Sequence, residues 1–284
     1  MATEDDLKRR IEELTAENKD LVRRASRDAR TITQLERLLA QNDKMQQASE
    51  RVNTNLYNEL MRVTQELAAQ TNRVNELLLN VLPAVIKDEL TARGHVASRA
   101  YEEATVLFSD FVGFTAFCER STAIQVVERL SAYFSAFDEI TSRLSLEKLK
   151  TVGDGYMCVG GVPTARESHA LDCVRAGLEF IRATQVINER YGSLGEPGFS
   201  IRVGIHTGPV VGGVIGTRKF AFDIWGDTVN TAARVQAIGV TDGVTISEAT
   251  FARVQGAVDC DDIGSVAAKG KSAELRRYHV KKVR

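Results

Sequence analysis

Neither proline nor glycine occurs in the first 82 residues, since the first proline is Pro83 and the first glycine is Gly94. Long apolar runs are also missing, and no stretch approaches the ~20 residues that a membrane-spanning helix needs. The four cysteines are widely spaced with no C-x-x-C pair, which favours reduced thiols and a cytoplasmic location over a disulfide framework. With a net charge of −1, the chain has no overall positive electrostatic potential that would attract nucleic acid or an anionic membrane. An anionic ligand must therefore be bound by locally clustered positive charge.

The residues that do precede Pro83 form a heptad seam. Apolar side chains recur at alternating steps of four and three over residues 7–39 and again over 56–81, flanked by Glu, Lys and Arg. This pattern predicts that residues 1–81 form a helix that pairs with a second copy as a parallel coiled coil for dimerisation or signalling. The seam turns polar in between, where a continuous coil, a break and a shifted frame all remain open. The polar seam positions are Asn42, Gln46, Ser49 and Asn53.

Residues 82–98 are predicted to be a junction, because Pro83 ends or bends the preceding helix and Gly94 suits the end of a short second one. The remaining stretch, 99–284, holds most of the glycines and is predicted to be the globular domain. No input signal is evident, and a sensor or regulator upstream of the chain is left open.

Two aspartates stand at the ends of predicted strands. The apolar run 104–109 ends at Asp110 and is followed by a glycine-containing turn, Phe111–Thr115, and by a helical pattern from Thr122. Gly-Asp-Gly at 153–155 predicts a hairpin that exposes Asp154. Each carboxylate alone suits a helix cap or a turn, but two at strand ends of one sheet suit two divalent metal ions in phosphoryl transfer.

Further candidate residues lie in the second half of the domain. Residues 199–216 read as two strand-like runs separated by turn glycines and are interpreted mostly as scaffold. A strand pattern changes to a helical pattern after Gly226. The four-residue spacing of Asn230 and Arg234 then places an amide and a cation on one face of that helix. Lys269 and Lys271 flank a glycine in a predicted loop. Each of these cations taken alone is ordinarily a solvated surface residue.

Taken together, three segments resemble the class III adenylyl and guanylyl cyclases in order, spacing and chemistry, and the resemblance covers about two thirds of the chain. The segments are Phe108–Thr115, Lys150–Met157 and Phe222–Arg234. The resemblance implies an α+β fold with a ferredoxin-like βαββαβ core and an added C-terminal strand pair. It also implies a head-to-tail homodimer that binds ATP at its interface, joined in this chain by the coiled coil.

On the metal side, the resemblance identifies Asp110 and Asp154 as ligands of two Mg²⁺ or Mn²⁺ ions per site. The backbone of Phe111, Val112, Gly113, Phe114 and Thr115 is expected to cradle the phosphates. Lys269 best matches the triphosphate-binding lysine, and Lys271 is close enough in sequence to leave that choice open.

On the base side, the resemblance makes Lys150 and Asp223 the pair that reads adenine, Asn230 the residue that positions the ribose and Arg234 the transition-state cation. Adenine offers an acceptor at N1 and a donor at its amine, which a Lys donor and an Asp acceptor complement. Guanylyl cyclases carry Glu and typically Cys at these two positions. The prediction is therefore an adenylyl cyclase that forms 3′,5′-cyclic AMP and pyrophosphate.

Division of labour between subunits follows from the same resemblance, because Lys150 and Asp154 serve opposite active sites of the dimer although they are four residues apart. Three alternatives compete with this reading. A guanylyl cyclase is disfavoured by Lys150 and Asp223, and a non-catalytic dimeric signalling scaffold is disfavoured because every named position holds a functional residue type. Other two-metal palm enzymes share the paired aspartates but not the 223–234 pattern.

Overall fold

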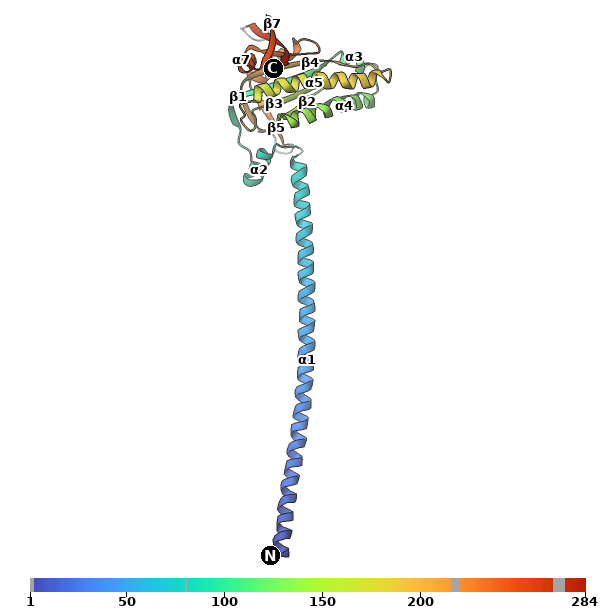
Figure 1. The fold of residues 1–284 in the computed structure, drawn as a ribbon, viewed down its shortest axis with the longest axis vertical. Coiled ribbons are helices and arrows are strands. Elements are labelled where there is room, and N and C mark those ends of the chain that lie inside the picture. Colours follow the sequence, from blue (N-terminus) through green and yellow to red (C-terminus); the bar gives the residue numbers. More distant parts are fainter. Residues whose placement is uncertain (1–2, 80, 216–219, 268–273) are drawn as a thin grey trace. The chain divides into compact units, whose positions relative to one another are not determined.

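The N-terminal part of the protein is one helix in the computed structural model, which describes residues 3–79, 81–215, 220–267 and 274–284. Helix α1 (Glu4–Leu79) runs without interruption through residues 41–53, so the polar centre of the heptad seam does not break it (Figure 1). Its seam residues are exposed, with Leu7 at 56% and Leu67 at 62% of their free surface. Pairing of this helix with a second copy stays a prediction. No helix in the described ranges is long and apolar enough to cross a membrane.

Residues 76–284 form a separate compact unit. Its elements are α2 (Ala84–Arg93), β1 (Arg99–Val112), α3 (Phe114–Cys118), α4 (Ala123–Arg143), β2 (Glu147–Val152), β3 (Gly155–Gly160), α5 (His169–Gly192), β4 (Ser200–Ile215), β5 (Ala221–Trp225), α6 (Asp227–Ala237), β6 (Gly243–Ser247), α7 (Glu248–Val254), β7 (Val258–Ala267) and β8 (Glu274–Val283).

The predicted α+β core is confirmed by the strand order. The series β1-α4-β2-β3-α5-β4 is a βαββαβ unit whose strands lie in the order β2-β3-β1-β4, and β6 and the hairpin β7–β8 extend the same sheet beyond β4. Strand β5 pairs with the far half of β4 and leaves the main path. The added C-terminal strand pair is therefore present, together with a parallel β4–β6 pairing.

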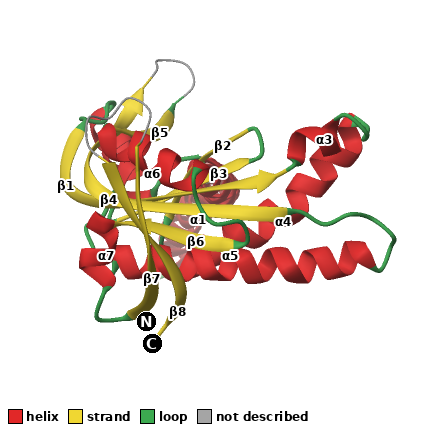
Figure 2. Ribbon diagram, turned by 90° about the horizontal axis from the view of Figure 1, so that it is seen from above, coloured by secondary structure: helices red, strands yellow, loops and turns green. Residues whose placement is uncertain are grey.

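Two apolar cores hold the unit together, one on each face of the sheet. Helices α4 and α5 lie over one face of the sheet (Figure 2). Between them Phe137 and Phe180 stack with ring centroids 4.1 Å apart. The other core combines strand residues with Ala232 of α6 and Ile86 of α2. A sheet buried on both faces explains why residues 104–107 of β1 form a continuous buried run rather than an alternating one.

The stretch predicted to be two strand-like runs is in fact a single strand, β4, of 16 residues. Pro209 stands in its middle, where proline cannot donate to a ladder. The ladder accommodates it because the register with β1 shifts between Tyr101 and Ala104, directly opposite this point. One continuous strand then serves both the β1 side and β5.

Helix α6 packs so closely on β4 that the backbones of the two elements approach each other directly. A Cβ added at Gly204 would lie 2.1 Å from the backbone nitrogen of Gln236, so only glycine allows this approach. Near the start of the helix, the buried hydroxyl of Thr228 donates a 2.6 Å hydrogen bond to the carbonyl of Pro209. The position of α6 is thus fixed at both ends by β4.

We expect Gly204→Ala to displace α6 and to lower the melting temperature by about 5–10 °C, because the new methyl group meets backbone rather than a movable side chain. Gly256→Ala is the matched control, since a Cβ there meets nothing within 4 Å. Thermal unfolding followed by circular dichroism compares the two variants. Equal melting temperatures would contradict the close packing of α6 on β4.

Candidate active site

The two aspartates predicted from the sequence lie together in the structure. Asp110 stands near the end of β1, and Asp154 occupies the two-residue turn of the β2–β3 hairpin, whose last ladder pair joins Val152 and Gly155. Burial, the charge of Asp154 and a hydrogen bond between the two carboxyls raise the pKa of Asp110 to about 6. A cation bound here would favour the ionised form of Asp110, which burial and the neighbouring charge disfavour.

Arg202 is a neighbour of this pair that the sequence reading assigned to scaffold. It lies directly opposite Asp110 in the β1–β4 ladder, and its charge lowers the pKa of Asp110. Its guanidinium also donates to Thr241 and to the carbonyl of Ala237, which ties it to the end of α6. Arg202 faces the carboxylates because of the β1–β4 register, and that register cannot be predicted from the sequence.

The residues present fit divalent metal ions in part. The described ranges hold no cluster of three or more His, Cys, Asp or Glu side chains suited to a metal ion. Asp110 and Asp154 offer the hard oxygen ligands that Mg²⁺ and Mn²⁺ prefer, and Mg²⁺ is commonly held by one or two carboxylates together with substrate phosphates. A two-carboxylate site of this kind is complete only when the phosphates are bound.

Lys150 and Asp223 come together although they are 73 residues apart. The Lys150 ammonium of β2 forms an ion pair with the Asp223 carboxylate of β5. Asp223 is largely buried, with 18% of its side chain exposed, while Lys150 is 44% exposed and open to a ligand. A donor and an acceptor therefore stand side by side, as recognition of one edge of a nucleobase requires.

Asn230 and Arg234 lie one turn apart on α6, as the spacing predicted. Asn230 is exposed, whereas the Nη1 atom of Arg234 is buried and finds no hydrogen-bond partner among the described residues. A buried guanidinium nitrogen without an acceptor is costly, and an anionic group is the natural acceptor for it.

The predicted phosphate cradle begins where β1 ends. Gly113 has φ of +79° and starts the short helix α3, so the backbone turns sharply between Val112 and Phe114. The first amides of a helix have no intrahelical partner and are free to bind an anion. The side chain of Phe111 is buried in the core, so this residue offers only its backbone to a ligand.

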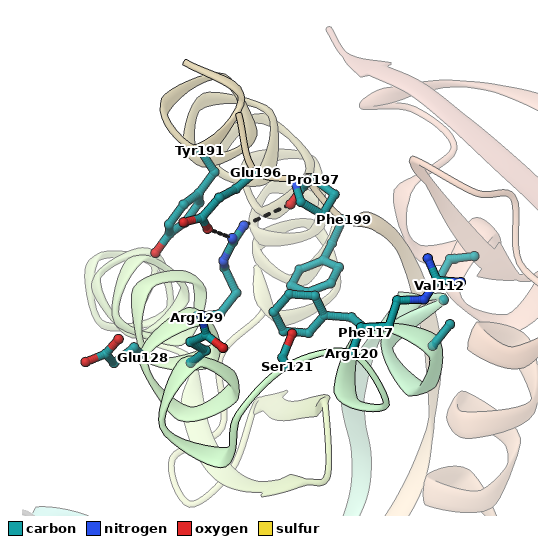
Figure 3. Close-up of a pocket in the computed structure, with 14 residues that line it drawn as sticks. Val112, Phe117, Arg120, Ser121, Glu128, Arg129, Tyr191, Glu196, Pro197 and Phe199 are labelled. Atoms are coloured by element: carbon teal, nitrogen blue, oxygen red, sulfur yellow. Dashed lines mark hydrogen bonds and ion pairs between the residues drawn. The ribbon is translucent and has the colours of Figure 1, made fainter. Parts of the chain in front are cut away.

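A cavity of about 530 Å³ opens beside this turn, between α3, the start of α4 and the α5–β4 loop (Figure 3). Buried Arg129 forms one wall: it lies 3.5 Å from the Tyr191 ring centroid, donates a 2.9 Å hydrogen bond to the carbonyl of Pro197 and pairs with Glu196. Of the predicted site residues that the structure describes, only Val112 and Gly113 line this cavity, so it adjoins the turn at Gly113 and does not contain Lys150 or Asp223.

Lys269 and Lys271 lie outside the described residues. The other predicted side chains form three groups: Asp110 with Asp154, Lys150 with Asp223, and the pair on α6.

Comparison with known proteins identifies the family. The model of the adenylate and guanylate cyclase catalytic domain matches residues 96–282. The chain belongs to the class III nucleotide cyclases. It is 40% identical over 190 residues to guanylate cyclase soluble subunit beta-2 of Rattus norvegicus, covering 66% of this chain and 27% of that protein. It is 35% identical over 213 residues to an adenylate cyclase of Mycobacterium bovis, covering 75% and 47%.

Among solved structures, the adenylyl cyclase CyaB from P. aeruginosa superposes with a TM-score of 0.63 at 27% identity, over 66% of this chain and 97% of that one. The chain spans less than half the length of the two relatives named above. Both adenylyl and guanylyl cyclases are among the relatives, so family membership establishes the cyclase domain and leaves the base to be argued from the site.

We expect Asp154→Asn to stabilise the metal-free protein by about 1–3 °C while removing most of the stabilisation that Mn²⁺ provides. The physical reason is that the substitution removes the charge that opposes ionisation of Asp110 and also one of the two proposed metal ligands. Thermal unfolding in chelator and in Mn²⁺ measures both effects. A loss of stability in chelator, or full stabilisation by Mn²⁺, would contradict the arrangement.

Proposed function

We propose that this protein is an adenylyl cyclase that converts ATP to 3′,5′-cyclic AMP and pyrophosphate as a head-to-tail homodimer. The observation that carries the proposal is the ion pair between Lys150 and Asp223. A lysine donor serves the N1 acceptor of adenine and an aspartate acceptor serves its exocyclic amine. Guanine presents the opposite pattern at the equivalent atoms, so it would leave both side chains facing groups of their own kind.

The remaining groups suit the chemistry of a cyclising phosphoryl transfer, in which the ribose 3′-oxygen attacks the α-phosphorus and pyrophosphate leaves. Asp110 and Asp154 would hold divalent metal ions, which would supply positive charge for the triphosphate and lower the pKa of the attacking hydroxyl. Arg202 adds a fixed cation on the same side of the sheet. Asn230 orients the ribose. The Arg234 guanidinium, whose Nη1 atom has no acceptor among the described residues, meets the charge that develops on the phosphorus.

Two subunits are required because each chain supplies complementary halves. In this proposal Asp110, Asp154 and the phosphate turn of one subunit face Lys150 and the α6 residues of the other. Exposed apolar side chains on β2, β4 and β5 support burial against a second copy. They are Val152, Val211, Ile215 and Trp225.

The helix α1 would then raise the local concentration of the partner domain, provided that its exposed seam pairs. This part of the proposal assigns residues 1–81 to dimerisation or signalling, 82–98 to a junction and 99–284 to catalysis.

Purified protein with Mn²⁺ should produce cyclic AMP from ATP at least about tenfold more efficiently than cyclic GMP from GTP, measured as kcat/KM. Lys150→Glu combined with Asp223→Cys should lower or reverse that preference, because both hydrogen-bonding patterns are then exchanged. Lys282→Gln, on the β7–β8 hairpin, is a surface-charge control. A wild-type protein with equal or reversed preference would overturn the base assignment and favour a guanylyl cyclase.

Mixing an inactive Asp110→Ala chain with an inactive Arg234→Ala chain should restore activity, up to about a quarter of wild type if half the dimers are mixed and each has one complete site. The matched control pairs Asp110→Ala with Asp154→Ala, which damages the same half in both chains and should restore nothing. If the first mixture stays inactive although heterodimers are shown to form, the shared-site arrangement is wrong.

A further inference from the structure

Strand β2 changes the face that its side chains occupy partway along its length. Its register with β3 pairs Lys148 with Cys158 but Lys150 with Met157, so Leu149 is one extra residue and forms a β-bulge. In a regular strand, side chains two residues apart share a face, and the two lysines would point the same way. A bulge reverses that relation and re-aims the residues beyond it.

The partners across the ladder show which face each lysine takes. Cys158 belongs to the core beneath α4 and α5, whereas Met157 belongs to the core on the α6 face. Lys148 accordingly reaches α4, where its ammonium lies 2.8 Å from a carboxylate oxygen of Asp138. Lys150 lies on the opposite face and pairs with Asp223.

Asp138 joins this ion pair to a rigid part of the core. Its Oδ1 atom, which lies 2.7 Å from the Lys148 ammonium, also accepts a 2.6 Å hydrogen bond from the hydroxyl of Tyr156, a fully buried residue of β3. Burial raises the pKa of Tyr156, so the phenol stays protonated and remains a donor. The tyrosine ring packs edge-on against Phe137 and Phe180, and the Lys148 ammonium lies 5.2 Å from its centroid.

The anchor matters because β2 is an edge strand. Within the part of the chain that the structure describes, it has one ladder, to β3, and lies at the end of the sheet order. The register and facing of an edge strand are weakly specified by hydrogen bonds alone. Immediately before the bulge, the hydrogen bond from Lys148 to Asp138 ties β2 to helix α4.

Building on the adenine-reading role of Lys150 in the proposed function, we propose that Lys148 and Asp138 are positioning residues for base selection. By holding Lys148 on the α4 face, they keep the bulge at Leu149 in place and so turn Lys150 to the opposite face, from which it reaches Asp223. Neither residue contacts the nucleotide in this proposal. Their effect is on which base is accepted.

The test compares Lys148→Met, which keeps the apolar stem, and Asp138→Asn, which keeps an acceptor for Tyr156, with the wild-type protein. Each should lower the ratio of kcat/KM for ATP to that for GTP by about two- to fivefold, the effect expected from loss of one partly exposed ion pair. The change should lie mainly in KM for ATP. Competition binding with non-cyclising ATP and GTP analogues should show the same shift, and amide exchange at residues 147–152 should quicken.

Glu179→Gln is the matched control, because it removes a comparable ion pair with Arg143 between α4 and α5. The double variant of Lys148 and Asp138 should be no worse than either single one, since both remove the same contact. A role in stability alone would lower activity with both nucleotides equally, so an unchanged ATP to GTP ratio overturns the inference even if exchange quickens.

A wild-type protein that shows no preference for ATP would overturn the proposed function instead. The inference is then decided by exchange at residues 147–152 and by KM for the nucleotide that the protein does use. Unchanged exchange and an unchanged KM in both variants would reject it.

Discussion

The antiparallel pairing of β1 with β4 is the constraint on which the rest of the site depends. It places Arg202 opposite Asp110, and it carries the bulge that lets Pro209 stand within a long strand. Past that point β4 pairs with β5, and its first half holds the backbone contact with α6 at Gly204. The proposed metal-side and base-side residues are therefore both positioned by one strand and its ladders.

The second feature is that the β2–β3 hairpin serves two purposes with a few residues. Its turn brings Asp154 to Asp110, while its outer strand brings Lys150 to Asp223. A regular strand would give Lys148 and Lys150 the same face. The bulge at Leu149 separates their directions, so that Lys148 contacts Asp138 of α4 while Lys150 pairs with Asp223.

Electrostatic strain is concentrated where substrate charge is expected. Burial and the neighbouring charge of Asp154 raise the pKa of Asp110 to about 6, and a guanidinium nitrogen of Arg234 is buried without an acceptor among the described residues. Both features cost stability in the unliganded chain and are relieved by ligands of opposite charge, a cation for the first and a phosphate for the second. A destabilised carboxylate and an unpaired cationic nitrogen in one domain are typical of a site that binds an anion together with metal ions.

The sequence by itself determined much of this protein. Local patterns predicted the long helix, the turn at Asp154 and the four-residue spacing on α6, because helix periodicity and hairpin turns depend on residues that are close in sequence. The combined motifs also identified the cyclase family, and with it the βαββαβ core. Tertiary structure decided what depends on pairing between distant segments.

Three features of this kind could not be predicted from the sequence. They are the position of Arg202 opposite Asp110, the continuity of strand β4 and the contact of Lys148 with Asp138. Each follows from a ladder register or from packing across a face of the sheet. A shift of one residue in register reverses the facing of every side chain, and no local pattern in the sequence records where such a shift occurs.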